Sequence, residues 1–362
     1  MKIMTDEAEF MARAIELAER GRHRVMPNPL VGCVLVRSGE IIAEGWHDHL
    51  GGLHAEQMAI ADAEARGVET QGSTAYVTLE PCNHFGRTPP CTEALMWAGV
   101  KKVVVGSPDP NPTVRGDGSE VLRNAGIDVT TGLLQDRCEE QMSQFMHWCQ
   151  HRQPEVLLKA AVDKNGKIDS DSAEATRFSS PESLKLVHDL RADSMAILVG
   201  VNTVIRDDPS LTVRGPDVGP RKQPIRIVID PNGRVPKNCK LMQDSLAPTL
   251  LIHIKEISTD DDAEHVERVV LSDDDGELDP QRIRYMLGDR EIQSLLVEGG
   301  ADTWQRFLDA DAIDRAHLCQ SPVSLPGNDG PFFGSVNLEN AGLNHQSTEI
   351  VGGDSISKWK RL

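Results

Sequence analysis

Residues capable of zinc chemistry occur close together in the first quarter of the chain. His54-Ala55-Glu56 is followed by Pro81-Cys82 and then by Cys91. One imidazole and two thiolates can hold a zinc ion and leave its fourth position to water. The carboxylate two residues after the histidine is not needed as a ligand and is therefore available to move protons. We predict a zinc site with the ligands His54, Cys82 and Cys91, and with Glu56 as the catalytic residue.

The order of these residues is that of the zinc deaminases of nucleobases, H-x-E…P-C-x-x-C. In that class the zinc activates a water molecule that attacks a ring carbon bearing an amino group, and the glutamate shuttles protons. The chain departs in one respect, because eight residues, 83–90, separate the two cysteines where the common signature has two. Two other interpretations stay open. The three residues could be unrelated, or the site could be structural with His84 as a fourth protein ligand.

Composition restricts the partners that this chemistry could serve. The 362 residues include 38 Lys plus Arg and 56 Asp plus Glu, for a formal net charge of −18. Nucleic acid binding needs a basic footprint, so we expect a small-molecule substrate and no nucleic acid. No apolar segment approaches a membrane span and none follows a basic start at the N-terminus, so we expect no membrane partner. An odd count of seven cysteines favours metal binding over disulfides in a reducing cytoplasm.

The elements expected around the motif form a layered α/β domain over residues 1–150. Apolar periodicity predicts a helix between Thr5 and Gly21, and a hairpin is expected around Ser38-Gly39. The other expected elements, in order, are a helix over 54–66, a strand over 74–79, a helix from Cys91, a strand over 103–105 and a helix over 120–125. In this arrangement Glu56 shares the first helical turn with His54, and each cysteine lies at or near a helix N-terminus, where the helix dipole favours thiolate.

A second α/β domain is expected over residues 154–362, after a boundary near His151-Arg152-Gln153-Pro154. Its expected strands cover 155–159, 196–199, 225–229, 249–254, 266–271 and 294–297, and its clearest helices cover 181–191 and 303–308. The turn Glu298-Gly299-Gly300 ends a strand and precedes a helix. Glycines before a helix N-terminus are a common phosphate-binding device, although they also simply turn chains.

The segments around the zinc motif closely resemble the bifunctional riboflavin-biosynthesis family that joins a diaminohydroxyphosphoribosylaminopyrimidine deaminase to a 5-amino-6-(5-phosphoribosylamino)uracil reductase. The segments that match are 27–32, 45–47, 54–56, 78–91 and 109–112 in the first half, and 199–214 and 297–300 in the second. The long spacer between the cysteines is itself the pattern of this family. The resemblance implies a cytidine-deaminase-like N-terminal domain and a dihydrofolate-reductase-like C-terminal domain.

The resemblance also implies a reaction, two cofactors and a set of site residues. The reaction is hydrolytic deamination of 2,5-diamino-6-(5-phosphoribosylamino)pyrimidin-4-one, followed by reduction of the ribosyl to a ribityl group with NADPH. The cofactors are zinc and NADPH. In the deaminase, Asn28 and His47 would bind the pyrimidine, and His84 and Arg87 the sugar phosphate. In the reductase, the substrate residues would be Lys159, Arg191, Leu211, Arg214 and Glu298, and the cofactor residues Ala161, Arg177, Thr203, Asp207, Gly299 and Gly300.

The second half departs from the family pattern in two places. Asp163-Lys164-Asn165-Gly166 stands where the family usually has Ser-x-Asp-Gly, and Arg177-Phe178-Ser179-Ser180 stands where it often has Trp-Ile-Thr-Ser. An alternative is therefore a monofunctional zinc pyrimidine deaminase whose second domain is degenerate and does not reduce. The sequence is compatible with a homo-oligomer and does not determine the oligomeric state.

Overall fold

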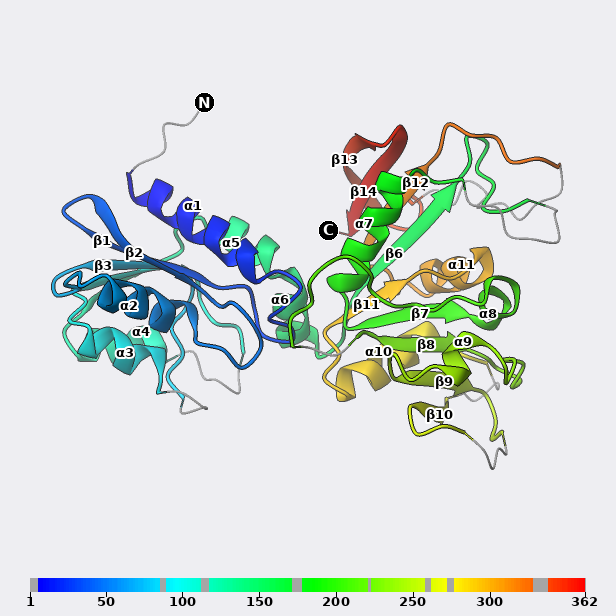
Figure 1. Ribbon diagram of the computed structural model, residues 1–362, viewed down its shortest axis with the longest axis horizontal. Coiled ribbons are helices and arrows are strands. Elements are labelled where there is room, and N and C mark those ends of the chain that lie inside the picture. The colour runs from blue at the N-terminus through cyan, green and yellow to red at the C-terminus, as the bar shows by residue number, and fades with distance from the viewer. Residues whose placement is uncertain are drawn as a thin grey trace. The chain divides into compact units, whose positions relative to one another are not determined.

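The computed structural model describes residues 6–84, 89–111, 117–170, 178–220, 223–257, 262–271, 277–327 and 338–361. The chain divides into two compact units (Figure 1). The first comprises residues 1–151 together with 217–221, and the second comprises 152–216 and 222–362. No helix in the described ranges has the length and apolar character that crossing a membrane would require.

The first unit is a three-layer α/β structure. Its elements are α1 (Asp6–Ala18), a 3-10 turn (Glu19–Gly21), β1 (Gly32–Arg37), β2 (Glu40–Trp46), α2 (Ala55–Ala65), β3 (Thr74–Leu79), α3 (Cys91–Trp97), β4 (Lys102–Ser107), α4 (Gly118–Asn124), β5 (Asp128–Thr131), α5 (Gln135–Gln141) and α6 (Ser143–His151). The described strands form one sheet in the order β2-β1-β3-β4-β5. β1 is antiparallel to β2 and β3, and β3, β4 and β5 are mutually parallel.

Successive side chains of β1 point to opposite faces of the sheet, and each face has its own apolar core. Cys33 and Leu35 of β1 pack with the buried alanines of α2 and with α3 and α4. Val34 and Val36 face the other way and pack with α1, α5 and α6. Because successive strand residues point to opposite faces, one strand supplies both layers. Figure 1 shows the same arrangement, with α2, α3 and α4 on one face and α1 and α5 on the other.

The second unit is built on a larger sheet. Its elements are β6 (Glu155–Val162), α7 (Pro181–Ala192), β7 (Ala196–Gly200), α8 (Val201–Asp207), β8 (Ile225–Ile229), α9 (Lys240–Gln243), β9 (Thr249–His253), β10 (Val266–Val270), α10 (Pro280–Asp289), β11 (Ser294–Val297), α11 (Ala301–Asp309), β12 (Arg315–Gln320), β13 (Leu343–Val351) and β14 (Asp354–Arg361). The order of the described strands is β10-β9-β8-β7-β11-β6-β12-β14-β13.

The strands from β10 to β12 in this order run parallel, and β14 and β13 continue the sheet antiparallel. Helices cover both faces. Apolar side chains of α10 and α11 pack on one face, and those of α7, α8 and α9 pack on the other. In open parallel sheets of this kind, ligands bind outside the carboxyl ends of the strands.

Candidate functional site

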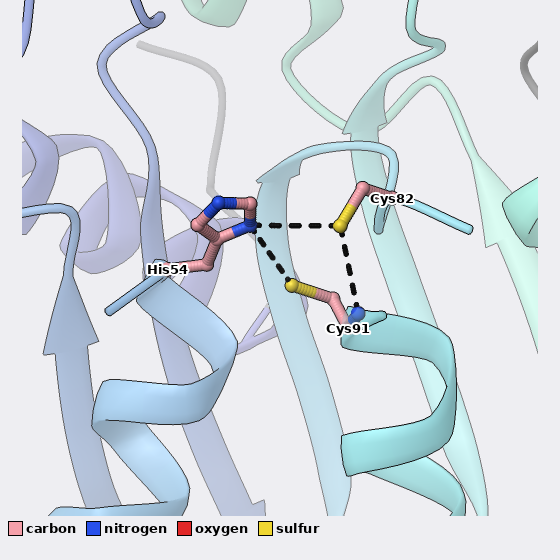
Figure 2. Close-up of side chains that lie close together, drawn as sticks. All are labelled: His54, Cys82 and Cys91. Atoms are coloured by element: carbon pink, nitrogen blue, oxygen red, sulfur yellow. Dashed lines mark hydrogen bonds between the residues drawn. The ribbon is translucent and has the colours of Figure 1, made fainter. Parts of the chain in front are cut away.

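Three elements of the first unit bring the predicted zinc ligands together (Figure 2). His54 is the residue that caps the N-terminus of α2, and its extended backbone precedes the first helical turn. Cys82 lies in the loop after β3, and Cys91 is the first residue of α3. Cys82 therefore does not begin a helix itself. Its sulfur nevertheless reaches the start of α3, where the Cys91 backbone N–H donates to it at 3.5 Å.

The distances between the three ligand atoms fit a single zinc ion. Nδ1 of His54 lies 3.3 Å from Sγ of Cys91 and 3.5 Å from Sγ of Cys82. A tetrahedral zinc with Zn–N of about 2.0 Å and Zn–S of about 2.3 Å separates such atoms by roughly 3.5 Å. Hydrogen bonds from Cys91 and His54 lower the pKa of Cys82 to about 4, against the effect of burial, so this thiol ionises readily. The donor set is therefore the one that zinc prefers.

Glu56 lies in the first turn of α2 directly beside these ligands. It is 3 % exposed, and its Oε2 accepts a hydrogen bond from Sγ of Cys91 at 3.3 Å. Burial, together with the nearby Cys82 thiolate, raises the pKa of Glu56 to about 7. A carboxyl group with a pKa close to the working pH both takes up and releases protons efficiently.

Asn28 and His47 lie together next to the zinc ligands. Nε2 of His47 is 3.1 Å from the side-chain amide nitrogen of Asn28, and the His47 and His54 rings meet edge to face at 5.6 Å. Nδ1 of His47 lies 2.9 Å from the carbonyl oxygen of Leu53, which can only accept, so this nitrogen carries the proton. Burial lowers the pKa of His47, which keeps the ring neutral. Nε2 therefore accepts from the Asn28 amide, and the Asn28 carbonyl oxygen remains available to a ligand.

One of the predicted deaminase residues, His84, is not part of this group. His84 is exposed, and the ligand cluster found among the described residues contains only His54, Cys82 and Cys91. The hypothesis that His84 completes a structural four-ligand site is therefore wrong for this geometry. Arg87 lies outside the described residues.

The structure adds one residue to the deaminase unit that the motif did not single out. Glu80 is buried and lies in the sequence between β3 and the predicted zinc ligand Cys82, and its two oxygens accept from different backbone segments. Oε1 accepts from the Ser119 N–H at 2.8 Å, and Oε2 accepts from the Asp109 N–H at 3.1 Å. Glu80 thus ties the cysteine loop to the start of α4 and to the loop after β4. The sequence feature that could have indicated this role is a carboxylate directly before Pro81-Cys82, at the end of a buried strand.

The second unit contains a cavity of about 1570 Å³ near the carboxyl ends of β7, β8 and β11. The predicted reductase residues that line it are Lys159, Ala161, Arg191, Thr203, Asp207, Leu211, Arg214, Glu298, Gly299 and Gly300. They come from β6, α7, α8, the loop after α8 and the turn after β11. The structure therefore brings together ten residues that span about 140 positions of sequence. Arg177 lies outside the described residues.

Charged groups concentrate at one part of this cavity. Arg191 donates two hydrogen bonds of 2.7 Å to the carboxylate of Glu298, and both side chains are about nine-tenths buried. Burial would raise the pKa of Glu298, but Arg191 and then Lys159 bring it below its ordinary value. Burial lowers the pKa of Lys159, and Glu298 opposes that change. A charged triad of this kind can orient a polar substrate and supply or accept a proton.

The glycine turn after β11 brings backbone close to the cavity. Gly300 caps α11, and a Cβ on Gly299 would lie 2.7 Å from Cβ of Thr303 in that helix. Only glycine fits at position 299 without a shift of the helix. The arrangement leaves the first N–H groups of a nine-residue helix at the cavity wall, where they can bind an anionic group.

The turn after β6 has asparagine at position 165, and its hydrogen bonds are made with that residue in place. The Asn165 N–H donates to Oδ1 of Asp163 at 2.7 Å, and its side-chain amide donates to Ser324 at 2.8 Å. Gly166 follows with φ of 88°, a conformation that favours glycine. The departure from the usual aspartate at this position therefore leaves the turn itself intact.

Comparisons with known proteins cover nearly the whole chain. The model for the cytidine and deoxycytidylate deaminase zinc-binding region matches residues 4–107, and the model for the RibD C-terminal domain matches residues 154–356. The riboflavin biosynthesis protein RibD of Actinobacillus pleuropneumoniae is 38 % identical over 98 % of this chain and 95 % of its own length. That of Aquifex aeolicus is 37 % identical over 98 % of both.

A solved structure is similar over the same extent. It is a diaminohydroxyphosphoribosylaminopyrimidine deaminase/5-amino-6-(5-phosphoribosylamino)uracil reductase from Thermotoga maritima. The two chains superpose with a TM-score of 0.86 and 35 % sequence identity, over 99 % of each chain.

Proposed function

The chain belongs to the RibD family of riboflavin-biosynthesis enzymes, and from that membership we propose how its own residues divide deamination and reduction between two units. It is a bifunctional enzyme, with a zinc-dependent deaminase of cytidine-deaminase-like fold and an NADPH-dependent reductase of dihydrofolate-reductase-like fold. The alternative of a deaminase with a degenerate second domain has less support, because family similarity extends through both halves. The proposed domains are residues 1–150 and 154–362.

For the deaminase, the proposed substrate is 2,5-diamino-6-(5-phosphoribosylamino)pyrimidin-4-one. His54, Cys82 and Cys91 would hold the zinc ion, which would supply a nucleophilic water of lowered pKa. Glu56 carries protons to the ring nitrogen and to the departing amine, which leaves as ammonia.

The other deaminase residues bind the substrate in this proposal. Asn28 accepts a hydrogen bond from the pyrimidine through its carbonyl oxygen, and His47 holds the Asn28 amide in that orientation. His84 and Arg87 remain our proposal for the sugar phosphate, since both belong to the loop between the cysteine ligands. An arginine there would offer charge-assisted hydrogen bonds to phosphate oxygens.

For the reductase, the proposed reaction converts the ribosyl group of the deaminated product to ribityl. The bound NADPH would supply the hydride for the C1 position of the sugar. We assign Ala161, Arg177, Thr203, Asp207, Gly299 and Gly300 to the cofactor, with the start of α11 facing its phosphates. We assign Lys159, Arg191, Leu211, Arg214 and Glu298 to the substrate, since the charged triad lies in the same cavity.

The proposal includes one class of partner and one cellular location. The substrate is a small molecule, and the net charge of −18 argues against a nucleic acid partner. We propose a cytoplasmic location, because the seven cysteines, all among the described residues, form no disulfide, which suits a reducing compartment.

The observation that carries the proposal is that the three predicted zinc ligands gather in one unit, whereas ten of the predicted reductase residues line one cavity in the other. The test uses the two activities of one chain. Glu56→Gln should abolish ammonia release and leave NADPH-dependent reduction of pre-deaminated substrate intact. Conversely, an Arg214→Ala, Glu298→Gln variant should stop NADPH oxidation while ammonia release continues. Loss of both activities in either variant, with zinc content and folding preserved, would count against the proposed division of labour.

A further inference from the structure

Side chains fix three consecutive backbone positions of the loop that carries Arg214. The carbonyl oxygen of Thr212 accepts from Nη1 of Arg191 at 3.2 Å, and the Val213 N–H donates to Gln223 at 2.7 Å. The Arg214 N–H donates to Nδ1 of His188 at 3.2 Å. A loop outside regular secondary structure is thus held at three consecutive residues, the last of which is Arg214.

Two of these three contacts come from the same face of α7. His188 and Arg191 are three residues apart, so their side chains are neighbours on the helix surface. Both line the cavity, and Arg191 is also the partner of Glu298. The helix that orients the buried Arg191–Glu298 pair therefore also sets the position of the loop that carries Arg214.

The hydrogen bond fixes the tautomer of His188. Nδ1 accepts from a backbone N–H, so the proton of the neutral ring lies on Nε2. Burial, Arg191 and Arg214 lower the pKa of His188, against the opposing effects of Glu298 and of a hydrogen bond to the Thr212 backbone. A protonated ring would have no lone pair for the Arg214 N–H.

The guanidinium of Arg214 has a different environment from that of Arg191. Arg214 is exposed at the cavity wall, and its side chain has no carboxylate partner among the residues that the structure describes. Arg191, by contrast, is committed to Glu298. An unpaired arginine is suited to a phosphate, which accepts charge-assisted and bidentate hydrogen bonds.

We propose that His188 is a positioning residue for the reduction. Through Nδ1 it holds the Arg214 backbone so that the Arg214 guanidinium meets the phosphate of the substrate. The inference rests on the proposed reductase function and adds to it a positioning residue, His188.

Three substitutions at one position separate this role from a structural one. Asparagine places an amide oxygen where Nδ1 of histidine lies, whereas glutamine reaches toward the position of Nε2 and alanine replaces neither. His188→Ala and His188→Gln should each raise KM for the deaminated substrate about tenfold, the size of one lost hydrogen bond. kcat should change less. His188→Asn should stay within about twofold of the wild-type KM. His265→Asn, a half-buried histidine of the same unit outside the cavity lining, is the matched control.

A double-mutant cycle with Arg214→Ala tests whether His188 acts through that residue. If it does, His188→Ala should add little in the Arg214→Ala background. Fully additive effects, or a His188→Asn variant as impaired as His188→Ala, would overturn the proposal. Loss of NADPH binding in His188→Ala would also overturn it, since the imidazole would then support the fold of the unit. Failure of the wild-type chain to oxidise NADPH would instead overturn the reductase function itself.

Discussion

At the scale of single residues, the proposed deaminase site assigns metal binding and proton transfer to different side chains. The three ligands come from three segments, and their donor atoms lie within 4.8 Å of one another. Glu56 is buried beside them and follows His54 by two residues on the same helix. Because the carboxylate lies in the group without being required as a ligand, substitutions should affect zinc content and turnover independently.

A Cys82→Ser, Cys91→Ser double variant should lose the zinc ion. Serine hydroxyls are weak zinc ligands compared with thiolates, and one imidazole cannot hold the metal alone. Metal analysis of the purified protein measures this directly. Cys149→Ser, which changes a buried cysteine on the other face of the sheet, should retain one zinc per chain. Full zinc occupancy in the double variant would show that the ion binds elsewhere.

Glu56→Gln should keep zinc and lose at least about 10²-fold in the rate of ammonia release, the lower range for general acid–base catalysis. The amide preserves size but cannot carry a proton. Glu64→Gln, an exposed position at the end of the same helix, should behave as wild type. Near-normal turnover by zinc-loaded Glu56→Gln would remove this residue from the mechanism.

At the scale of elements, the strands that lead into the sites were predictable, and β5 and the last three strands were not. The bounds expected for β3, β8 and β11 are those observed, because each is a short buried apolar run. β12, β13 and β14 were not predicted. β13 pairs only with β14 and is exposed over most of its length, so its sequence has no apolar alternation. Its strand structure depends on a partner that local sequence does not reveal.

The same division holds for the candidate sites. Motif spacing predicted that His54, Cys82 and Cys91 would lie together, as they do, because ligand chemistry restricts those residue types. Glu80 and His188 escaped prediction, since their importance depends on backbone N–H groups that folding brings from elsewhere in the chain. Family resemblance, rather than residue pattern, supplied the reductase residues that line the cavity.

The turn after β6 provides a test at this scale. Oδ1 of Asp163 accepts from the Asn165 and Lys167 N–H groups, and Oδ2 accepts from Leu325 N–H at 2.9 Å. Asp163→Ala should therefore destabilise the second unit by about 2–4 kcal/mol, because buried donors lose a charged acceptor. The measurement is the denaturant midpoint of the transition that NADPH stabilises. Asp289→Ala, an exposed residue of α10, is the control, and equal midpoints for the two variants would contradict the prediction.

The stability of the second unit should fall as the pH is lowered. Hydrogen bonds hold the pKa of Asp163 below its ordinary value, despite the opposing effect of burial. A lowered pKa contributes stability above the unfolded-state pKa of about 3.9, and that stability is lost as the pH falls through the folded-state pKa. Asp163→Asn should therefore weaken the acid dependence of unfolding. An unchanged dependence between about pH 5 and pH 2 would contradict this account.

At the scale of the whole molecule, two units with separate cores carry two chemistries. The predicted zinc ligands all belong to the first unit, and the cavity is lined by residues of the second. Removing zinc with a chelator should therefore abolish ammonia release and leave reduction of pre-deaminated substrate within about twofold of its initial rate. Restoring zinc should restore ammonia release. Parallel loss of both activities on chelation would indicate that the second unit depends on the metal.

The central claim is that one chain performs both reactions, and NADPH oxidation by the wild-type protein tests it most directly. Zinc-loaded protein is given the diaminopyrimidinone phosphate and NADPH, and ammonia and NADP⁺ are measured in the same reaction. The account predicts that ammonia appears first and that one NADPH is then oxidised for each ammonia released. Sustained ammonia release by folded protein that neither binds nor oxidises NADPH would contradict it, and would leave a deaminase joined to an inactive second unit.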